Sequence, residues 1–209
     1  MFRDRLHAGQ ELAELLKPLN LKHPLVLAIP RGGVVVGHQV ALGLQADLDV
    51  VLAKKIGAPF NPEFAVAAVD QDGHVTFPPS GGTYASQEYI QDRALDVSKQ
   101  IARQLDYFRQ GRKPIEPKGR HVVVVDDGLA TGLTALAAIK YVRRLKPSKL
   151  VLAVPVSPRE TLDTLAQYVD QVVCVDTPAP FYAVGQWYAR FDQVDDDTVR
   201  QILAQAQSR

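Results

Sequence analysis

The chain has 209 residues, 46% of them hydrophobic and 22% charged, with a net charge of +1 and one cysteine, Cys174. This length suits one domain with a full hydrophobic core, so we expect a single domain over residues 1–209. The balanced charge argues against a nucleic-acid or membrane-surface partner, and a lone cysteine excludes a disulfide within the chain. No apolar run is long enough to span a membrane and the polar N-terminus is not a signal peptide, so we expect a cytoplasmic protein.

Strand and helix patterns alternate along the chain, and most predicted strands are apolar at every position. Continuous apolar strands are typical of a parallel sheet that helices cover on both faces. We therefore expect an α/β fold with a doubly wound parallel sheet. The predicted strands are residues 24–29, 48–53, 121–127, 149–156 and 171–175, and the predicted helices are residues 34–44, 84–111 and 131–145, with one more helix at each end of the chain.

Two local signals add detail to this pattern. Residues 64–77 are typical of a hairpin that turns at Asp72-Gly73. The motif SPRE, which begins at Ser157, predicts a helix start in which Ser157 is the cap, the proline follows at the first helical position and the glutamate completes a capping box.

Charged residues and glycines follow three of the predicted strands. The motif PRGG at residues 30–33 follows the first strand, Lys54-Lys55 follow the second, and Asp126-Asp127 end the apolar run that starts at residue 122. Ligands of open parallel sheets bind outside the carboxyl ends of the strands. We therefore expect these three groups to meet at one edge of the sheet.

The loop after the two acids predicts an anion site. Its glycines let several backbone N–H groups point into one concavity, the helix that follows adds its positive end, and two threonines add hydroxyl donors. The loop lacks the lysine of the nucleotide-triphosphate motif, so it is sized for one phosphate. A plain strand-to-helix turn is the alternative. The loop residues are Gly128, Ala130, Thr131, Gly132, Leu133 and Thr134.

Asp126 and Asp127 make a ribose phosphate the favoured ligand. Adjacent acids at the end of a buried strand repel each other and lose hydration, so they need cations or donors opposite them. The two hydroxyls of a sugar diol are suitable donors. The alternatives are a phosphoacceptor aspartate, which would not have an anion-binding glycine loop directly after it, and a solvated loop that carries two acids.

The PRGG motif and the lysine pair suit a larger anion than one phosphate. Arg31 is a permanent cation, and Gly32 and Gly33 let backbone amides approach a ligand closely. Lys54 and Lys55 add two cations at the neighbouring strand end, with an exposed loop as the alternative explanation for them.

These motifs resemble those of the type I phosphoribosyltransferases. VVVVDDGLATGLTA resembles the diphosphoribose-binding motif, PRGG the pyrophosphate loop, LDVVLAKKIGAP a segment of adenine phosphoribosyltransferase, and FYAVGQWYARF the hood of hypoxanthine-guanine phosphoribosyltransferase. The motifs follow the family's order from the first strand to the tail. The resemblance implies the family's doubly wound sheet, with a core over residues 1–175, a mobile loop at residues 70–86 and a small C-terminal hood at residues 176–209.

The resemblance also implies an activity. A Mg²⁺-dependent enzyme of this family would transfer a phosphoribosyl group from phosphoribosyl pyrophosphate to a base and release pyrophosphate, and a homodimer is expected. The resemblance implies that Asp126 and Asp127 contact the ribose hydroxyls and, indirectly, the metal, and that residues 128 and 130–134 contact the 5′-phosphate. It implies that the pyrophosphate is contacted by Arg31, Gly32, Gly33, Lys54 and Lys55. The implied base contacts are Tyr182 and Trp187. Arg31, the two lysines and the two acids would be the catalytic set.

Two positions depart from the enzymes that read 6-oxopurines. Pro155 stands where those enzymes have a lysine, and Ala189 stands where they have an acid. The resemblance therefore leaves the acceptor open. It also leaves open a regulator of the same fold that binds phosphoribosyl pyrophosphate or a nucleotide without catalysis, and a different ribose-phosphate enzyme such as a nucleotide hydrolase.

Overall fold

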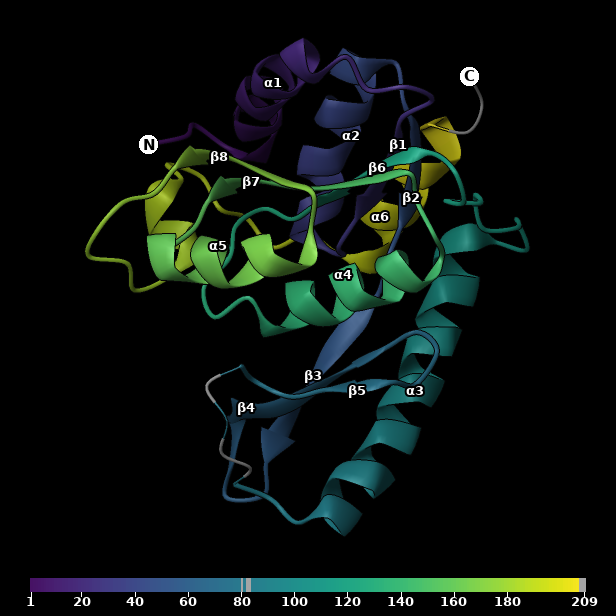
Figure 1. The fold of residues 1–209 in the computed structure, drawn as a ribbon, viewed down its shortest axis with the longest axis vertical. Helices are drawn as coiled ribbons and strands as arrows, with labels where there is room; N and C mark the ends of the chain where they lie inside the picture. Colours follow the sequence, from purple (N-terminus) through teal and green to yellow (C-terminus); the bar gives the residue numbers. More distant parts are fainter. Residues whose placement is uncertain (80, 82–83, 207–209) are drawn as a thin grey trace.

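A parallel sheet is the centre of the protein, for which we analysed a computed structural model that describes residues 1–79, 81 and 84–206 (Figure 1). Within these residues the sheet has five strands in the order β2-β1-β6-β7-β8, and every neighbouring pair is parallel. The prediction of a parallel α/β sheet is confirmed. The strands are β1 (Leu25–Ala28), β2 (Asp47–Val50), β6 (His121–Val125), β7 (Lys149–Val156) and β8 (Gln171–Asp176).

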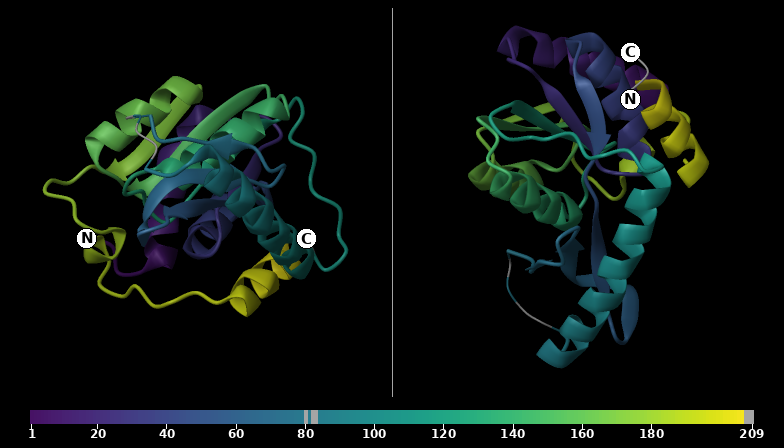
Figure 2. Two further views of the ribbon diagram at one scale, coloured as in Figure 1. Left: turned by 90° about the horizontal axis from the view of Figure 1, so that it is seen from below. Right: turned by 90° about the vertical axis from the view of Figure 1, so that its right-hand side faces the viewer.

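Helices cover both faces of this sheet (Figures 1 and 2). One apolar cluster joins alternate strand residues such as Val26 and Val123 to α1, α2 and α6. The other cluster joins the intervening residues, such as Leu25 and Val122, to α4 and α5. Burial on both faces explains why the central strands β1, β6 and β7 are almost entirely apolar. The helices are α1 (Arg5–Leu16), α2 (Gly32–Leu44), α4 (Leu133–Arg144), α5 (Arg159–Leu165) and α6 (Asp196–Ala206), with short 3-10 helices η1 (Lys17–Leu19), η2 (Ala166–Tyr168) and η3 (Val184–Trp187).

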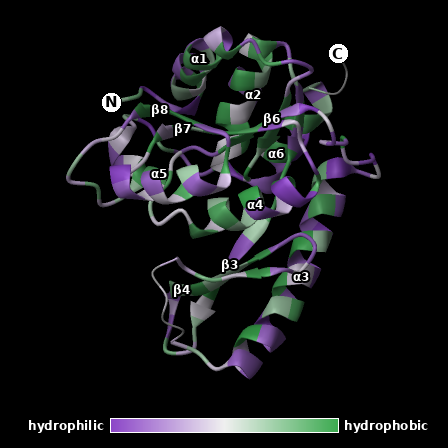
Figure 3. Cartoon of the chain, viewed as in Figure 1, coloured by the Kyte–Doolittle hydropathy of each residue, from purple (hydrophilic) through white to green (hydrophobic). Residues whose placement is uncertain are grey.

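A small antiparallel sheet and a long helix project from this core (Figure 1). The sheet consists of β3 (Ala53–Ala58), β4 (Asn61–Asp70) and β5 (Val75–Thr76), and it packs against α3 (Gln87–Arg109). Hydrophobic and hydrophilic residues alternate in bands along α3, as an amphipathic helix requires (Figure 3). The predicted hairpin is confirmed, with Gly73 at φ +84° in its turn.

The prediction of a second strand over residues 48–53 is wrong about where that strand ends. The parallel strand β2 stops at Val50, and the chain then crosses to the small sheet. The Val51 N–H still donates to Ala28 of β1 at 3.0 Å, whereas the Leu52 N–H donates to the Gln71 side chain of the hairpin, also at 3.0 Å. The lysines that follow therefore lie inside β3. A continuous apolar run does not reveal where the chain leaves one sheet for the other.

The predicted cap at Ser157 is also wrong. The helix α5 begins at Arg159, its cap position is Pro158, and the Ser157 hydroxyl does not cap it. Ser157 is fully buried, and its backbone N–H donates to Asp176 at the end of β8 at 3.3 Å. Ser157 is therefore bonded to the edge of the sheet, whereas the local motif predicts it as the cap of the helix.

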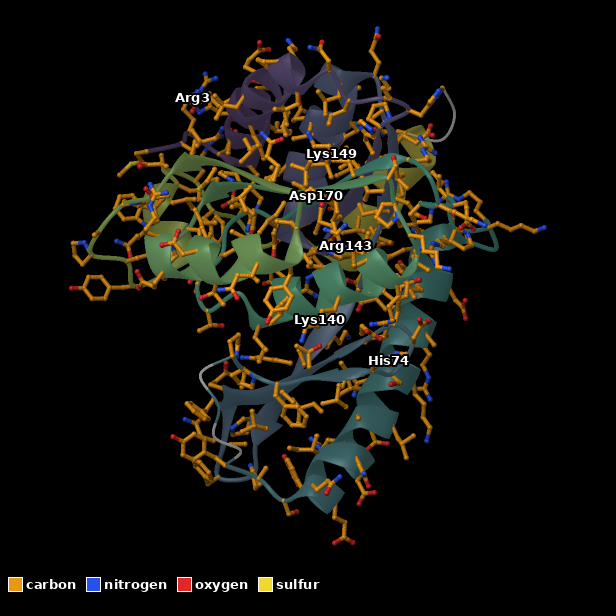
Figure 4. All side chains as sticks on the ribbon, viewed as in Figure 1. Arg3, His74, Lys140, Arg143, Lys149 and Asp170 are labelled. Carbon is orange, nitrogen blue, oxygen red and sulfur yellow. The ribbon has the colours of Figure 1, made fainter. Side chains whose placement is uncertain are left out.

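An ion pair and a cysteine thiol near β7 and β8 have structural roles. At the amino edge of the sheet, the Arg143 guanidinium lies 3.2 Å from Asp170, which also accepts from the Leu150 N–H at 2.6 Å (Figure 4). On β8, burial raises the pKa of the Cys174 thiol to about 11, as expected for a structural strand cysteine.

The chain's tail returns to the N-terminus at the carboxyl edge. The Phe2 N–H donates to Trp187 at 2.8 Å, the Ala189 N–H donates to Phe2 at 2.8 Å, and the Arg190 N–H donates to Arg3 at 2.9 Å. These bonds place the start of α1 and the tail side by side, next to the end of β6. Among the described residues, no helix is both long and apolar enough to cross a membrane.

Candidate functional site

Asp126 and Asp127 lie directly against the PRGG motif. A Cβ on Gly33 would be 2.9 Å from the Asp126 Oδ1, and a Cβ on Gly32 would be only 1.9 Å from the Asp127 Oδ2. Only glycine allows the start of α2 to approach the acids this closely. The structure thus brings the first and third predicted groups together at the carboxyl edge of the sheet.

The cation that faces the acids is Arg5, which sequence reasoning missed. Its Nε donates to the Asp127 Oδ2 at 2.7 Å, and both side chains are largely buried, with 11% and 15% exposed. Its guanidinium lies 3.8 Å from the centre of the Phe191 ring, and its Nη1 donates to the Asp192 carbonyl at 2.7 Å. The acids predict a cation opposite them, but nothing in the local sequence indicates that it comes from α1.

The environment of the acids favours an added proton or a ligand that carries donors. Burial raises the pKa of the Asp126 carboxyl well above its usual range, and the Asp127 charge raises it further. Burial also raises the pKa of Asp127, although Arg5 opposes this. The Asp126 Oδ1 accepts the Asp127 N–H at 2.8 Å. Hydroxyl groups or a cation placed here would offset both burial and repulsion.

The glycine loop between β6 and α4 has the backbone that an anion cradle needs. Gly132 caps α4 with φ +73°, and a Cβ there would be 2.8 Å from Thr161. The Thr161 hydroxyl donates to the Ala130 carbonyl at 2.7 Å and so holds the loop from α5. Thr131 is exposed, and the helix α4 begins two residues later. The first N–H groups of α4, which have no partner within the helix, and the exposed Thr131 therefore belong to the same short segment.

Lys54 and Lys55 have different charged neighbours. The charges of Asp196 and Arg31 act on the half-buried Lys54: burial lowers its pKa, Asp196 raises it and Arg31 lowers it. Arg31 itself lies 3.7 Å from the Asp196 Oδ1. Lys55 instead lies 2.9 Å from the Glu63 Oε2 on β4. Lys54 thus lies within electrostatic range of Arg31, whereas Lys55 forms an ion pair with Glu63.

Two cavities adjoin this edge. The larger, about 760 Å³, lies between α4, α5 and the small sheet, and its walls include Lys55 and Thr131. The smaller, about 360 Å³, lies between α1, the PRGG motif and the tail. Two arginines on its wall suit an anion. The residues that line it are Arg5, Arg31, Gly32, Phe191, Gln193 and Val194.

Comparison with known proteins assigns this arrangement to a family. The chain matches the phosphoribosyl transferase domain model over residues 4–186. The protein belongs to the phosphoribosyl transferase domain family. It is 43% identical over 99% of its length to a Mycobacterium tuberculosis (strain H37Rv) protein named "Putative phosphoribosyl transferase Rv0571c". It spans 47% of that protein, or about half the length of the curated relatives it matches.

Two solved structures share the fold of this chain. TT1426 from Thermus thermophilus superposes with a TM-score of 0.84 at 44% identity, covering 98% of each chain. The AQ2163 protein from Aquifex aeolicus superposes with a TM-score of 0.52 at 14% identity, covering 83% of this chain and 72% of that one. The second likeness is one of fold alone. The predicted family and fold class are confirmed.

In this member of the phosphoribosyl transferase domain family, the tail reaches the acids through aromatic residues other than the two predicted base contacts, Tyr182 and Trp187. Tyr182 is 81% exposed, and Trp187 stacks on Phe181 with ring centroids 6.1 Å apart. Tyr188 is instead 6% exposed, and its hydroxyl donates to the main-chain carbonyl of Asp127. Phe191 packs against the flat face of Arg5. Which aromatic faces the acids depends on the path of the tail, which the local sequence does not indicate.

Proposed function

We propose that the protein transfers a phosphoribosyl group from phosphoribosyl pyrophosphate to a nitrogen of a base or related acceptor and releases pyrophosphate. The observation that carries this proposal is the contact of Asp126 and Asp127 with Gly32 and Gly33 on one side, while an anion-binding glycine loop follows on the other. Such a site matches the three parts of this substrate, which are a phosphate, a diol and a diphosphate.

The ribose end of the substrate would occupy the acids and the loop. Asp126 and Asp127 would accept hydrogen bonds from the 2′ and 3′ hydroxyls, which are donors that suit buried carboxylates. Residues 128 and 130–134 would hold the 5′-phosphate through backbone N–H groups and the Thr131 and Thr134 hydroxyls. The exposed Thr131 and the left-handed Gly132 support this assignment.

The reaction would break the bond between ribose C1 and the diphosphate oxygen and form a bond from C1 to the acceptor nitrogen. Positive charge develops on the sugar and negative charge on the leaving diphosphate, while the acceptor nitrogen loses its proton. Arg31, Lys54 and the N–H groups of Gly32 and Gly33 would stabilise the leaving group. The proximity of Lys54 to Arg31 supports its inclusion, whereas the Glu63 partner of Lys55 makes Lys55 the weaker candidate.

We also propose that Mg²⁺ takes part, held mostly by substrate oxygens and water. The site offers two carboxylates, one of which is paired with Arg5. Among residues 1–79, 81 and 84–206, no group of three histidine, cysteine, aspartate or glutamate side chains forms a metal cage. Mg²⁺ retains waters and commonly binds through one or two carboxylates together with substrate phosphates, so this donor set fits. When bound, it would neutralise charge on the diphosphate.

The acceptor side involves the tail and the segment over residues 70–86. Tyr182 and Trp187 remain predicted base contacts, and the largely exposed position of Tyr182 would require the tail to move toward the acids. Residues 70–86 would close over the sugar and exclude water, as the family resemblance implies. Ser80, Gly82 and Thr83 of that segment lie outside the described residues.

The test combines binding and turnover. Phosphoribosyl pyrophosphate with Mg²⁺ should bind in a calorimetric titration, and one member of a panel of bases should cause release of pyrophosphate. The Asp126→Asn, Asp127→Asn double variant should lose the binding while retaining its circular dichroism spectrum. No binding by the wild-type protein would contradict the proposal, and binding without release on any base would favour a regulatory protein.

A further inference from the structure

Arg5 joins four separate segments at the proposed ribose site. It is the first residue of α1, yet its Nε lies 2.7 Å from Asp127, 122 residues away at the end of β6. The side chain packs beside Gly32 of the PRGG motif, where a Cβ would be 2.7 Å from the same Nε. Phe191 and Asp192 of the tail hold its other side. This convergence indicates that Arg5 sets the geometry of one acid.

We propose that Arg5 is a positioning residue for substrate binding: it fixes the Asp127 carboxylate so that its remaining lone pairs accept a ribose hydroxyl. This inference rests on the proposed function, because it takes the ribose diol as the ligand of the acids. It adds to the site a residue from the N-terminal helix that neither the sequence motifs nor the family resemblance indicates.

A role in folding alone does not explain this ion pair. Two charged groups that are largely buried lose hydration, and the attraction between them often does no more than offset that cost. The pair also requires a glycine at position 32, since any side chain there would overlap both partners. The chain thus keeps a largely buried ion pair and a required glycine, although such pairs commonly add little net stability. A carboxylate fixed for a ligand gives these constraints a purpose.

The contacts of Arg5 are directional. Its Nε edge meets one carboxylate oxygen, its Nη1 meets a main-chain carbonyl, and its flat face lies on the Phe191 ring at 3.8 Å. A planar guanidinium held on three sides has little freedom to rotate, so it transmits a fixed orientation to Asp127. The main chain of Asp127 is held independently, because its carbonyl accepts the Tyr188 hydroxyl. Side chain and backbone of this one acid are therefore both restrained from outside its loop.

Action through Asp127 and direct contact with the diphosphate predict different results. Arg5 also lines the small cavity with Arg31, so direct contact is the competing explanation. If Arg5 acts through Asp127, its removal weakens only ligands that carry the ribose. If Arg5 touches the diphosphate, inorganic pyrophosphate also binds less tightly.

The experiment uses Arg5→Gln, Arg5→Lys and, as a matched control, Arg190→Gln. Arg190 forms an ion pair at 2.6 Å with Asp4, the residue before Arg5, and its side chain is 71% exposed. Loss of a charge-assisted hydrogen bond predicts that Arg5→Gln binds phosphoribosyl pyrophosphate with Mg²⁺ about tenfold more weakly, that Arg5→Lys recovers part of the affinity, and that Arg190→Gln matches the wild-type protein. Affinity for inorganic pyrophosphate with Mg²⁺ should be unchanged in all three.

A double-mutant cycle decides whether the effect passes through the acid. In an Asp127→Asn background, Arg5→Gln should cause no further loss of affinity for phosphoribosyl pyrophosphate. Equal losses in both backgrounds, or a loss of pyrophosphate affinity, would overturn the inference. If Arg5→Gln does not fold, Arg5→Lys takes its place in the cycle.

The same double-mutant cycle can also be measured in the free energy of unfolding, without any ligand. A measurable coupling between Arg5 and Asp127 in urea unfolding shows that the pair forms in solution, and its absence overturns the inference. If the wild-type protein fails to bind phosphoribosyl pyrophosphate although the coupling is present, the proposed function fails while the ion pair stands. The two failures are thereby distinguished.

Discussion

The Tyr188 hydroxyl donates to the main-chain carbonyl of Asp127, across 61 residues of sequence. Tyr188 is buried between the rings of Phe2 and Phe191, with centroids 5.3 and 5.0 Å away. Burial and the Asp127 charge raise the pKa of the Tyr188 hydroxyl above its usual value, which favours the protonated form that donates this bond. The tail is thereby attached to the backbone of the proposed ribose site.

Removing this hydroxyl should weaken both the fold and the site. We expect Tyr188→Phe to lower the free energy of unfolding by about 1 kcal/mol, because the Asp127 carbonyl loses a buried donor. Affinity for phosphoribosyl pyrophosphate should fall as well. Urea unfolding and calorimetric titration measure the two effects. Tyr182→Phe is the control, since that side chain is 81% exposed, and a similar loss in the control would contradict the explanation.

A methyl group on Gly32 should disrupt the acids directly. The Cβ of Gly32→Ala would be 1.9 Å from the Asp127 Oδ2 and 2.7 Å from the Arg5 Nε, so both must move. Overpacking of this kind commonly costs about 1–3 kcal/mol, and we expect binding of phosphoribosyl pyrophosphate to be lost while most of the fold remains. Calorimetry and circular dichroism test this. Unchanged binding would mean that the acids do not need to contact the PRGG motif.

Asp126 should make stability depend on pH. Because its pKa is raised in the folded protein above the unfolded value of 3.8, the folded state retains a proton that the unfolded state releases. The free energy of unfolding should therefore fall as the pH rises from about 4 through the raised pKa, and then level off. Asp126→Asn should remove this part of the pH dependence and be the more stable protein at neutral pH. Urea unfolding between about pH 4 and pH 8 measures the difference, and a variant with the wild-type pH profile would contradict the assignment.

The lysine pair offers a matched comparison. Lys54→Gln should lower the rate of pyrophosphate release by about tenfold or more, because a cation beside the leaving group is lost. Lys55→Gln should change the rate little, since Lys55 is paired with Glu63. Steady-state rates with a saturating acceptor compare the two variants. Equal effects would show that the lysines are not distinguished by their surroundings.

Much of the fold could be predicted because its signals are local. The apolar strands and the helices between them depend on periodicity, and their alternation restricts the topology to a parallel sheet. The crossing from β2 to β3 could not be predicted in this way, because Leu48 and Leu52 belong to one continuous apolar run. In the structure Leu48 lies in β2, whereas the Leu52 N–H donates to the hairpin. The error in placing Lys54 and Lys55 follows from that single crossing.

The sequence was enough to predict a parallel sheet with the two acids, the glycine loop behind them and the PRGG motif at one edge. Each of these predictions depends on residues that are close in sequence or on a general rule of parallel sheets. The need of Asp126 and Asp127 for a cation also followed from the repulsion of adjacent buried charges. The three-dimensional fold was required to show that this cation is Arg5, that Lys55 pairs with Glu63 while Lys54 lies within electrostatic range of Arg31, and that the Tyr188 hydroxyl contacts Asp127. The contacts of Arg5 and Tyr188 with Asp127 join residues far apart along the chain, and they depend on how its two ends pack against the sheet, which no local pattern encodes.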